Sequence, residues 1–126
     1  MIKVGITGNN GFIGRHLSSA IEANPSDFVH IYFSRDYFHD ENSMDRFVKE
    51  CDVIIHLAAI NRHENDQILH DTNVSLVQKL IDALVRTRSK PKVLFSSTIQ
   101  EKGHNAYGNS KRRGKELFIS WSKEHA

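Results

Sequence analysis

The stretch TGNNGFIG, residues 7–14, decides the fold of this chain of 126 residues. It follows a short apolar run that is typical of a buried strand. It precedes residues 12–23, whose apolar side chains recur at helical spacing. In such a turn Gly8 permits the tight bend, Gly11 lets the backbone approach a pyrophosphate, and Gly14 lets the helix pack on the strand. The free N–H groups at the start of the helix then face the phosphates. This context favours a dinucleotide-binding turn over a glycine-rich turn without a ligand.

Outward from this turn, strand-like and helix-like segments alternate along the chain. Apolar periodicity and turn residues predict strands at 2–7, 28–33, 53–57 and 93–97, and helices at 12–23, 43–50, 73–86 and 110–123. Ser43 is expected to cap the second helix, and the continuous apolar run at 53–57 is typical of a strand buried on both faces. The alternation predicts an α/β fold, a Rossmann-like doubly wound parallel sheet of four strands in the order 3-2-1-4.

Composition and charge exclude several classes of protein. The chain is 39% hydrophobic and 25% charged, which is typical of one globular domain. Its formal net charge of +2 gives no reason to expect a nucleic-acid partner. The single cysteine, Cys51, excludes an internal disulfide, and no HExxH pattern occurs, so no metal site is expected. No apolar run approaches membrane-spanning length and residues 1–4 lack signal-peptide features, so we expect no membrane partner and a cytoplasmic location.

The residues after the second predicted strand bear on the choice of dinucleotide. A turn that prefers NAD is followed, about 20 residues on, by Asp or Glu, which binds the ribose 2′-hydroxyl. Here Ser34 stands at that place and Arg35 follows it, and an arginine can pair with the 2′-phosphate of NADP. Asp36 supports the competing interpretation, because a shift of one residue would restore the acid. We predict NADP (as NADPH), with NAD as the alternative.

A tyrosine and a lysine four residues apart, Tyr107 and Lys111, stand at the start of the last predicted helix. Residues at this spacing share one helical face. A lysine cation beside a phenol favours the phenolate, which makes the tyrosine a better proton donor and acceptor; the alternative is an ordinary surface pair. The fourth strand ends in Ser96-Ser97-Thr98, so hydroxyls emerge at the edge of the sheet where such folds bind ligands. A hydroxyl there would hydrogen-bond a substrate carbonyl oxygen while Tyr107 protonates it.

Together these segments resemble the extended short-chain dehydrogenase/reductase superfamily of NAD(P)-dependent nucleotide-sugar epimerases, dehydratases and reductases. TGNNGFIG is similar to the family's TGxxGFIG, and DVIIHLAA at residues 52–59 is similar to its DxVxHLAA segment. Asn73-Val74 begins a helix similar to the family's NVxGTxN helix, and SST followed by YxxxK completes the set. The resemblance covers almost the whole chain, and the joint occurrence of the motifs in this order is far more specific than any one of them.

The resemblance implies the residues of the site. The catalytic residues would be Thr98, with Ser97 as the alternative, the acid/base Tyr107, and Lys111, which would bind the nicotinamide ribose and tune the tyrosine. The residues expected to bind the cofactor are Gly8, Asn10, Gly11, Phe12, Ile13, Gly14, Ser34, Arg35, Leu57, Ala58, Ala59, Asn73 and Lys111. The reaction would be hydride transfer between nicotinamide and a sugar carbon, with proton transfer by the tyrosine.

A closer resemblance is to one subgroup, the bacterial reductases of UDP-N-acetyl-L-fucosamine synthesis, used for capsule and O-antigen. It rests on HLAAINR at 56–62, SSTIQ at 96–100 and the short gap from Thr98 to Tyr107. Members reduce the C4 keto group of a UDP-linked deoxy amino sugar with NADPH, which implies a UDP-sugar substrate here. Arg62 would then lie near the sugar or its diphosphate, or be an ordinary loop arginine.

The subgroup also implies a larger protein, with a substrate domain and a C-terminal cupin domain that have no counterpart here. Residues 1–126 are therefore expected to be the N-terminal part of an NAD(P)-binding Rossmann domain. A truncated remnant is favoured over a genuine short protein that completes its sheet by self-association. A non-catalytic NADP-binding module that acts through a partner is the alternative function. The family's packing of the Asn73 and Tyr107 helices across a dimer implies a homodimer, with Phe118 and Trp121 at its interface.

Overall fold

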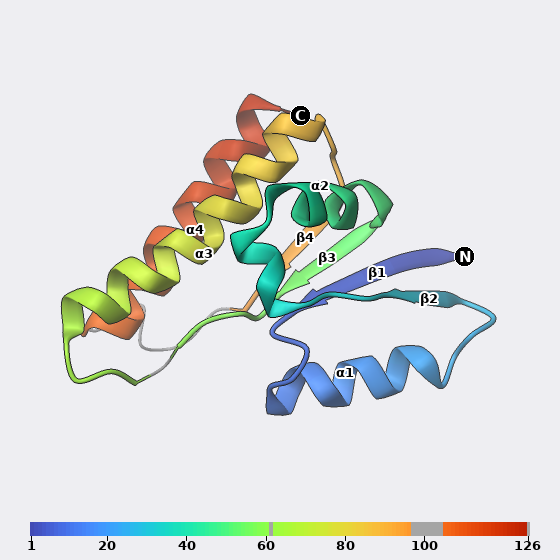
Figure 1. Ribbon diagram of the computed structural model, residues 1–126, viewed down its shortest axis with the longest axis horizontal. Coiled ribbons are helices and arrows are strands. Elements are labelled where there is room, and N and C mark those ends of the chain that lie inside the picture. Colours follow the sequence, from blue (N-terminus) through green and yellow to red (C-terminus); the bar gives the residue numbers. More distant parts are fainter. Residues whose placement is uncertain (61, 97–104, 126) are drawn as a thin grey trace.

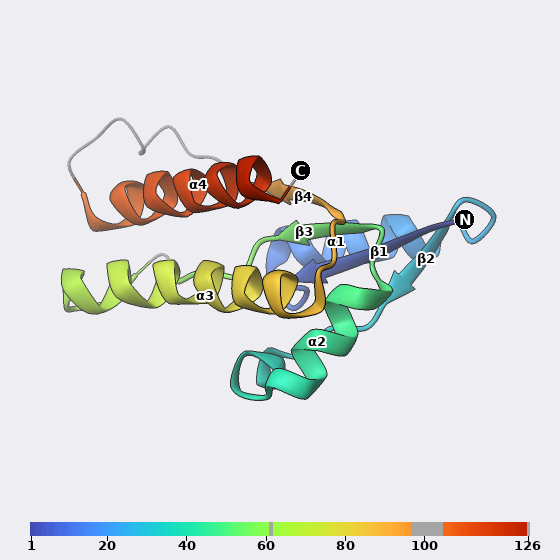
Figure 2. The same ribbon diagram turned by 90° about the horizontal axis from the view of Figure 1, so that it is seen from above.

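Figure 1 shows the computed structural model, which describes residues 1–60, 62–96 and 105–125. In chain order the elements are β1 (Ile2–Thr7), α1 (Phe12–Glu22), β2 (Phe28–Ile31), the 3₁₀ helix η1 (Arg35–His39), α2 (Glu41–Glu50), β3 (Val53–His56), α3 (Asp66–Thr87), β4 (Lys92–Phe95) and α4 (Ala106–Glu124). The four strands form one parallel sheet. Helix α1 covers one face, and α2, α3 and α4 cover the other (Figures 1 and 2). The predicted α/β fold with a parallel sheet is confirmed.

The strand order is β2-β1-β3-β4, which corrects the expected order 3-2-1-4. Strand β3 pairs with β1 on one side and with β4 on the other. The reason is visible in β3 itself, because a strand whose Ile54 is fully buried must be enclosed between neighbours, whereas the expected order would have left it at an edge. The chain therefore changes direction across the sheet between β1 and β3. The carboxyl ends of these two strands form the switch point where open α/β sheets bind ligands.

Apolar side chains form two cores of unequal size. The smaller core lies under α1 and contains Val4, Ile6 and Ile21. The larger core lies between the sheet and helices α2, α3 and α4, and includes Phe33, Phe38, Met44, Phe47, Val48, Ile54, Val77, Leu80, Leu84 and Phe118. Cys51 belongs to the larger core, and burial, followed by the charges of the neighbouring acids, raises the pKa of its thiol to about 12. This core holds the elements that carry the candidate site.

Three helices begin earlier than predicted, and each has a side-chain cap. Asp40, rather than Ser43, caps α2 by accepting hydrogen bonds from the backbone N–H groups of residues 42 and 43. Asn65 caps α3, two turns before Asn73, and Asn105 caps α4. Asp and Asn are favoured caps because their side-chain oxygens satisfy N–H groups that have no partner within the helix. The first turn of α2 is mostly polar and that of α4 contains a glycine, so apolar periodicity alone did not reveal these starts.

Within the described ranges, no helix has both the length and the apolar character needed to span a bilayer.

Candidate functional site

The glycine-rich turn between β1 and α1 has the geometry that its glycines were expected to provide. Gly8 has a φ of +73°, which residues with a side chain rarely adopt. A Cβ on Gly8 would also stand 2.8 Å from the backbone nitrogen of Ala58. Gly14 is buried beneath the turn, where a Cβ would stand 2.8 Å from Cα of Asn9. The turn therefore lies tightly against both the segment after β3 and the first helix.

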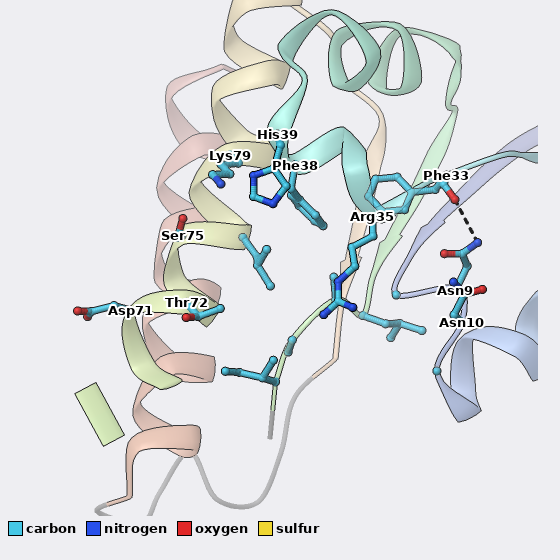
Figure 3. Close-up of a pocket in the computed structure, with 17 residues that line it drawn as sticks. Asn9, Asn10, Phe33, Arg35, Phe38, His39, Asp71, Thr72, Ser75 and Lys79 are labelled. Atoms are coloured by element: carbon cyan, nitrogen blue, oxygen red, sulfur yellow. Dashed lines mark hydrogen bonds between the residues drawn. The ribbon is translucent and has the colours of Figure 1, made fainter. Parts of the chain in front are cut away.

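A cavity of about 660 Å³ opens beside this turn, at the switch point between β1 and β3 (Figure 3). Four parts of the chain line it: the glycine turn, the end of β2 with η1, the loop after β3, and one face of α3. The Asn9 side-chain amide donates to the Phe33 carbonyl oxygen at 3.2 Å, which ties the turn to the segment after β2 (Figure 3). The lining residues are Gly8, Asn9, Asn10, Gly11, Phe33, Arg35, Phe38, His39, Leu57, Ala58, Ala59, Ile60, Asp71, Thr72, Ser75, Leu76 and Lys79.

The cavity brings together most of the residues that the sequence proposes for the cofactor. Those that line it are Gly8, Asn10, Gly11, Arg35, Leu57, Ala58 and Ala59. Phe12 and Ile13 lie in the first turn of α1 with exposed side chains. Ser34 does not line the cavity, because its hydroxyl caps η1 by accepting from the N–H of Asp36 at 3.3 Å.

Helices α3 and η1 also contribute lining residues, and the sequence did not predict these contributions. Thr72, Ser75, Leu76 and Lys79 lie on one face of α3, and Phe38 and His39 come from η1. The α3 residues follow helical spacing and three of them lie within the predicted helix, but spacing does not tell which other elements this face of the helix meets. No pattern in the sequence marked η1.

Basic side chains from separate elements line the cavity. Arg35 comes from η1 and Lys79 from α3, and Figure 3 shows His39 beside Lys79. In the part of the chain that the structure describes, neither Arg35 nor Lys79 makes an ion pair with an acid. Among the described residues of the lining, Asp71 is the one carboxylate, and it is engaged by Gln67 and His70. The cavity is therefore suited to an anionic ligand.

The tyrosine and the lysine of the YxxxK motif meet at the end of β4. The Lys111 side chain is buried, 4% exposed, and its Nζ donates to the Ser96 hydroxyl at 3.0 Å. The same Nζ lies 4.7 Å from the ring centroid of Phe95 and 5.8 Å from that of Tyr107. Thr98 and Ser97, expected to supply the catalytic hydroxyl, lie outside the described residues. The structure thus places a cation beside the tyrosine ring, with a hydroxyl as a neighbour.

His56 is fully buried beneath this group. Its ring stacks on Phe95, with centroids 5.8 Å apart and an interplanar angle of 19°. Burial, and secondarily the charge of Lys111, lower the pKa of His56 to about 3. His56 is therefore neutral at pH 7.

Asn73 was expected to bind the cofactor, but its amide is engaged within the protein. Both its oxygen and its nitrogen bond to the backbone of Ile60, and the nitrogen also donates to Ser110 of α4. Arg62 is exposed in the loop after β3. Among residues 1–60, 62–96 and 105–125, no group of three or more His, Cys, Asp or Glu side chains could hold a metal ion.

Comparison with known proteins gives a consistent result. The model of the NAD dependent epimerase/dehydratase family matches residues 4–126. A UDP-2-acetamido-2,6-beta-L-arabino-hexul-4-ose reductase of Pseudomonas aeruginosa is 31% identical over 115 residues, which cover 91% of this chain and 30% of that protein. A UDP-N-acetyl-alpha-D-glucosaminuronate decarboxylase of Bacillus cytotoxicus is 31% identical over 120 residues, covering 78% of this chain and 37% of that protein. This chain thus spans about a third of the length of the curated relatives it matches.

Solved structures share the fold. The capsular polysaccharide assembling protein CapF of Staphylococcus aureus superposes with a TM-score of 0.71 at 31% identity, covering 99% of this chain and 33% of that one. RMD of Pseudomonas aeruginosa, solved in complex with NADPH, has a TM-score of 0.82 at 20% identity, covering 97% of this chain and 49% of that one. At that identity the second likeness concerns the fold alone.

Proposed function

This chain belongs to the NAD dependent epimerase/dehydratase family, and from this premise we propose that it is the cofactor-binding part of an NADPH-dependent nucleotide-sugar reductase. The proposed substrate is a 4-keto UDP-deoxy-amino-sugar of capsule or O-antigen synthesis. The name of the Pseudomonas relative, a hexul-4-ose reductase, supports the reaction, and the similarity to CapF supports the capsule pathway. Residues 1–126 are proposed to form the first part of the NAD(P)-binding Rossmann domain.

The observation that carries this proposal is the position of Lys111. A buried lysine beside the Tyr107 ring, at the carboxyl end of β4, lies at the same edge of the sheet as the glycine turn. A buried ammonium group is costly unless it is bonded, and here Ser96 and the Phe95 ring partner it. A buried lysine beside a tyrosine is expected at a site of proton transfer, whereas an ordinary Tyr-Lys pair lies on the protein surface.

The cavity fits a dinucleotide. At Gly11 an added Cβ would meet only the Gly8 carbonyl oxygen, at 3.4 Å, so the absence of a side chain leaves room for a pyrophosphate at the backbone. Gly11 is also the N-cap of α1, whose first N–H groups have no acceptor within the helix. Phe12 and Ile13 would therefore act through their backbone. Arg35 would pair with the 2′-phosphate of NADP.

The chain's own residues would handle the proton. Bound NADPH supplies the hydride for the sugar carbonyl carbon. The Tyr107 hydroxyl would donate its proton to the carbonyl oxygen, and the Lys111 cation would stabilise the phenolate that remains. Thr98, or Ser97, would donate a hydrogen bond to the same oxygen and so orient the carbonyl.

A fluorescence titration with NADPH and then NADH tests the cofactor. We expect saturable binding with a preference for NADPH. Arg35→Ala should weaken NADPH binding about tenfold and leave NADH binding unchanged, since one charge-assisted contact to phosphate is lost. The exposed Arg46 of α2 gives the control Arg46→Ala, which should match the wild type. Equal affinity for the two cofactors would contradict the NADP assignment, and a folded chain that binds neither would contradict the site.

The reaction is tested by NADPH oxidation with a UDP-4-keto sugar. Tyr107→Phe should abolish turnover and leave NADPH binding intact. Turnover that persists in Tyr107→Phe would contradict the role of the tyrosine, and NADPH binding without turnover by the wild-type chain would favour the alternative, a cofactor-binding module that acts through a partner.

We also propose a homodimer through α3 and α4. The two helices lie side by side (Figures 1 and 2), and a groove between them is lined by Val85, Leu117 and Trp121 among others. Burying these apolar side chains against a second copy would remove them from water. Light scattering at micromolar concentration should give twice the monomer mass, and a monomer alone would contradict the dimer.

A further inference from the structure

Both polar atoms of the Asn73 side chain bond to Ile60, which lies in the cavity-lining loop at residues 57–60, here called the cofactor loop. The side chain is 4% exposed. Its Oδ1 accepts from the Ile60 N–H at 2.7 Å, and its Nδ2 donates to the Ile60 carbonyl oxygen at 2.8 Å. The Ile60 N–H can donate only to the amide oxygen of Asn73, and the Ile60 carbonyl oxygen can accept only from the amide nitrogen. Ile60 therefore determines which way the Asn73 amide is oriented. The second Nδ2 hydrogen goes to Ser110, which leaves no donor for a ligand.

Ser110 continues the network into the helix that carries the tyrosine. Its side chain is 1% exposed in α4, and its Oγ lies 3.1 Å from Nδ2 of Asn73. The Ser110 hydroxyl donates in turn to the Tyr107 carbonyl oxygen at 2.7 Å. A relay of hydrogen bonds therefore runs from Ile60, at the cavity wall, through Asn73 and Ser110 to the first turn of α4.

A polar pair is an unusual way to join two packed helices. The rest of the contact between α3 and α4 includes Val77, Leu80, Ile81 and Phe118, and such apolar contacts tolerate small slides. Hydrogen bonds are directional, and a buried amide that loses its partner costs free energy. Asn73 and Ser110 therefore favour one position of α4 along α3, and the same amide holds the loop that lines the cavity.

We propose that Asn73 and Ser110 are positioning residues that hold Tyr107 at a fixed position relative to the cofactor loop, residues 57–60. This inference rests on the proposed function and extends it, because a cofactor bound against the loop would also order the first turn of the tyrosine helix. Neither residue touches the reacting atoms. Their role is exerted through Ile60 on one side and Tyr107 on the other.

Amide hydrogen exchange of the full chain tests the relay without any ligand. Ser110→Ala removes the hydroxyl that joins the two helices, and Ser122→Ala, at an exposed position of α4, is the matched control. Loss of one buried hydrogen bond should speed the exchange of the Ile60 amide about tenfold in Ser110→Ala and leave it unchanged in Ser122→Ala. A merely local role of Ser110 would speed exchange within α4 alone, and that result would overturn the proposal.

The variant Asn73→Asp tests the same hydrogen-bond network at its α3 end. The carboxylate keeps the shape and can still accept from the Ile60 N–H, but it has no hydrogen to donate to Ser110 or to the Ile60 carbonyl oxygen. Exchange at residues 108–111 of α4 should rise about tenfold, and the double variant should show no further increase, because both substitutions break one network. Additive effects would overturn the proposal. If Asn73→Asp does not fold, the exchange rate of the Ile60 amide in Ser110→Ala, compared with that in Ser122→Ala, tests the proposal by itself.

NADPH then separates this inference from the proposed function. In the wild type, saturating NADPH should protect both the loop at 57–60 and residues 107–111. In Ser110→Ala the protection should remain at the loop and be lost in α4. Equal protection of α4 in the two proteins would overturn the relay, whereas failure of the wild type to bind NADPH would refute the proposed function and leave the ligand-free exchange test standing.

Discussion

Thr7 Oγ1 lies 2.7 Å from Nδ1 of His56, and the two residues are register partners in β1 and β3. The same hydroxyl accepts from the backbone N–H groups of Leu57 and Ala58, each at 3.1 Å. With both lone pairs engaged, the hydroxyl gives its single hydrogen to Nδ1. His56 must therefore carry its proton on Nε2, which has no hydrogen-bond partner among the described residues. Nitrogen-15 NMR should find this tautomer, and a proton on Nδ1 would contradict the assignment.

The burial of His56 predicts how stability depends on pH. Its pKa is about 3 in the folded chain, against a usual value of 6.5. Between these values the unfolded chain binds the proton first, so protonation favours unfolding. The contribution of His56 is complete above pH 6.5 and falls as the pH drops toward 3, by up to about 1.4 kcal/mol per pH unit.

Urea unfolding at several pH values measures this contribution. The variant His56→Gln does not titrate, and it keeps an oxygen that can accept from Thr7. The difference between wild type and variant in the free energy of unfolding should be constant above pH 7 and should shrink below pH 6. A difference that stays constant down to pH 4.5 would contradict the prediction.

Lys111 contributes to the depressed pKa of His56 through its charge, as the second cause after burial. Removing that charge with Lys111→Met, which preserves length and packing, should raise the pKa of His56 while leaving it below 6.5, because the ring stays buried. A proton–carbon NMR titration of the ring reports the change. The exposed Lys123→Met is the control, and its His56 titration should equal that of the wild type.

Two glycines of the same turn should respond differently to alanine. Gly8→Ala forces a side chain onto a φ of +73° and against the Ala58 backbone, so it should lower the free energy of unfolding by at least about 1 kcal/mol. Gly11→Ala meets only the Gly8 carbonyl oxygen at 3.4 Å and should leave stability within about 0.5 kcal/mol. It should nevertheless weaken NADPH binding, because the methyl group occupies the cavity. Thermal unfolding and a cofactor titration of both variants check this, and equal stability losses would refute it.

Arg86 and Asp45 form a two-pronged ion pair between α3 and α2. Arg86 donates through Nη2 at 2.7 Å and through Nε at 3.1 Å to the same carboxylate. The side chains are 37% and 24% exposed, so solvent screens the pair, and a double-mutant cycle with alanine should give a coupling of about 0.5–1 kcal/mol. The longer and more exposed pair of Arg113 and Glu116, at 3.5 Å, should give a coupling near zero. A larger coupling for the second pair would contradict this ranking.

The sequence predicted the parts of the fold that depend on local pattern. The glycines of residues 7–14 stand where a turn requires a positive φ and a close approach, and the apolar run at 53–57 indicated a buried strand. The spacing of Tyr107 and Lys111 placed them on one helical face, and the structure confirms that they lie together. Each of these features is determined by residues that are near one another in the chain.

Features that depend on distant contacts were not predictable. The order of the strands depends on which apolar segments become neighbours in the sheet. The periodicity of a segment carries no information about its neighbours. Thr72 lies before the predicted start of the helix, and Lys79 lines the cavity together with residues of η1 and of the loop after β3, which are distant in the chain. Asn73 matched a motif, but its amide is used by Ile60 and Ser110, which no spacing rule brings together.

The central place of β1 has a consequence for the order in which the protein can form. Residues 2–7 are synthesised before the other three strands, and they pair on one side with residues 28–31 and on the other with residues 53–56. Every pairing in the sheet is parallel, so each must close a long loop before it gains any contact. The edge of β1 that faces β3 therefore stays open until residues 53–56 have been synthesised, even after β2 has paired with the other edge. During that interval of translation the open edge is accessible to a chaperone.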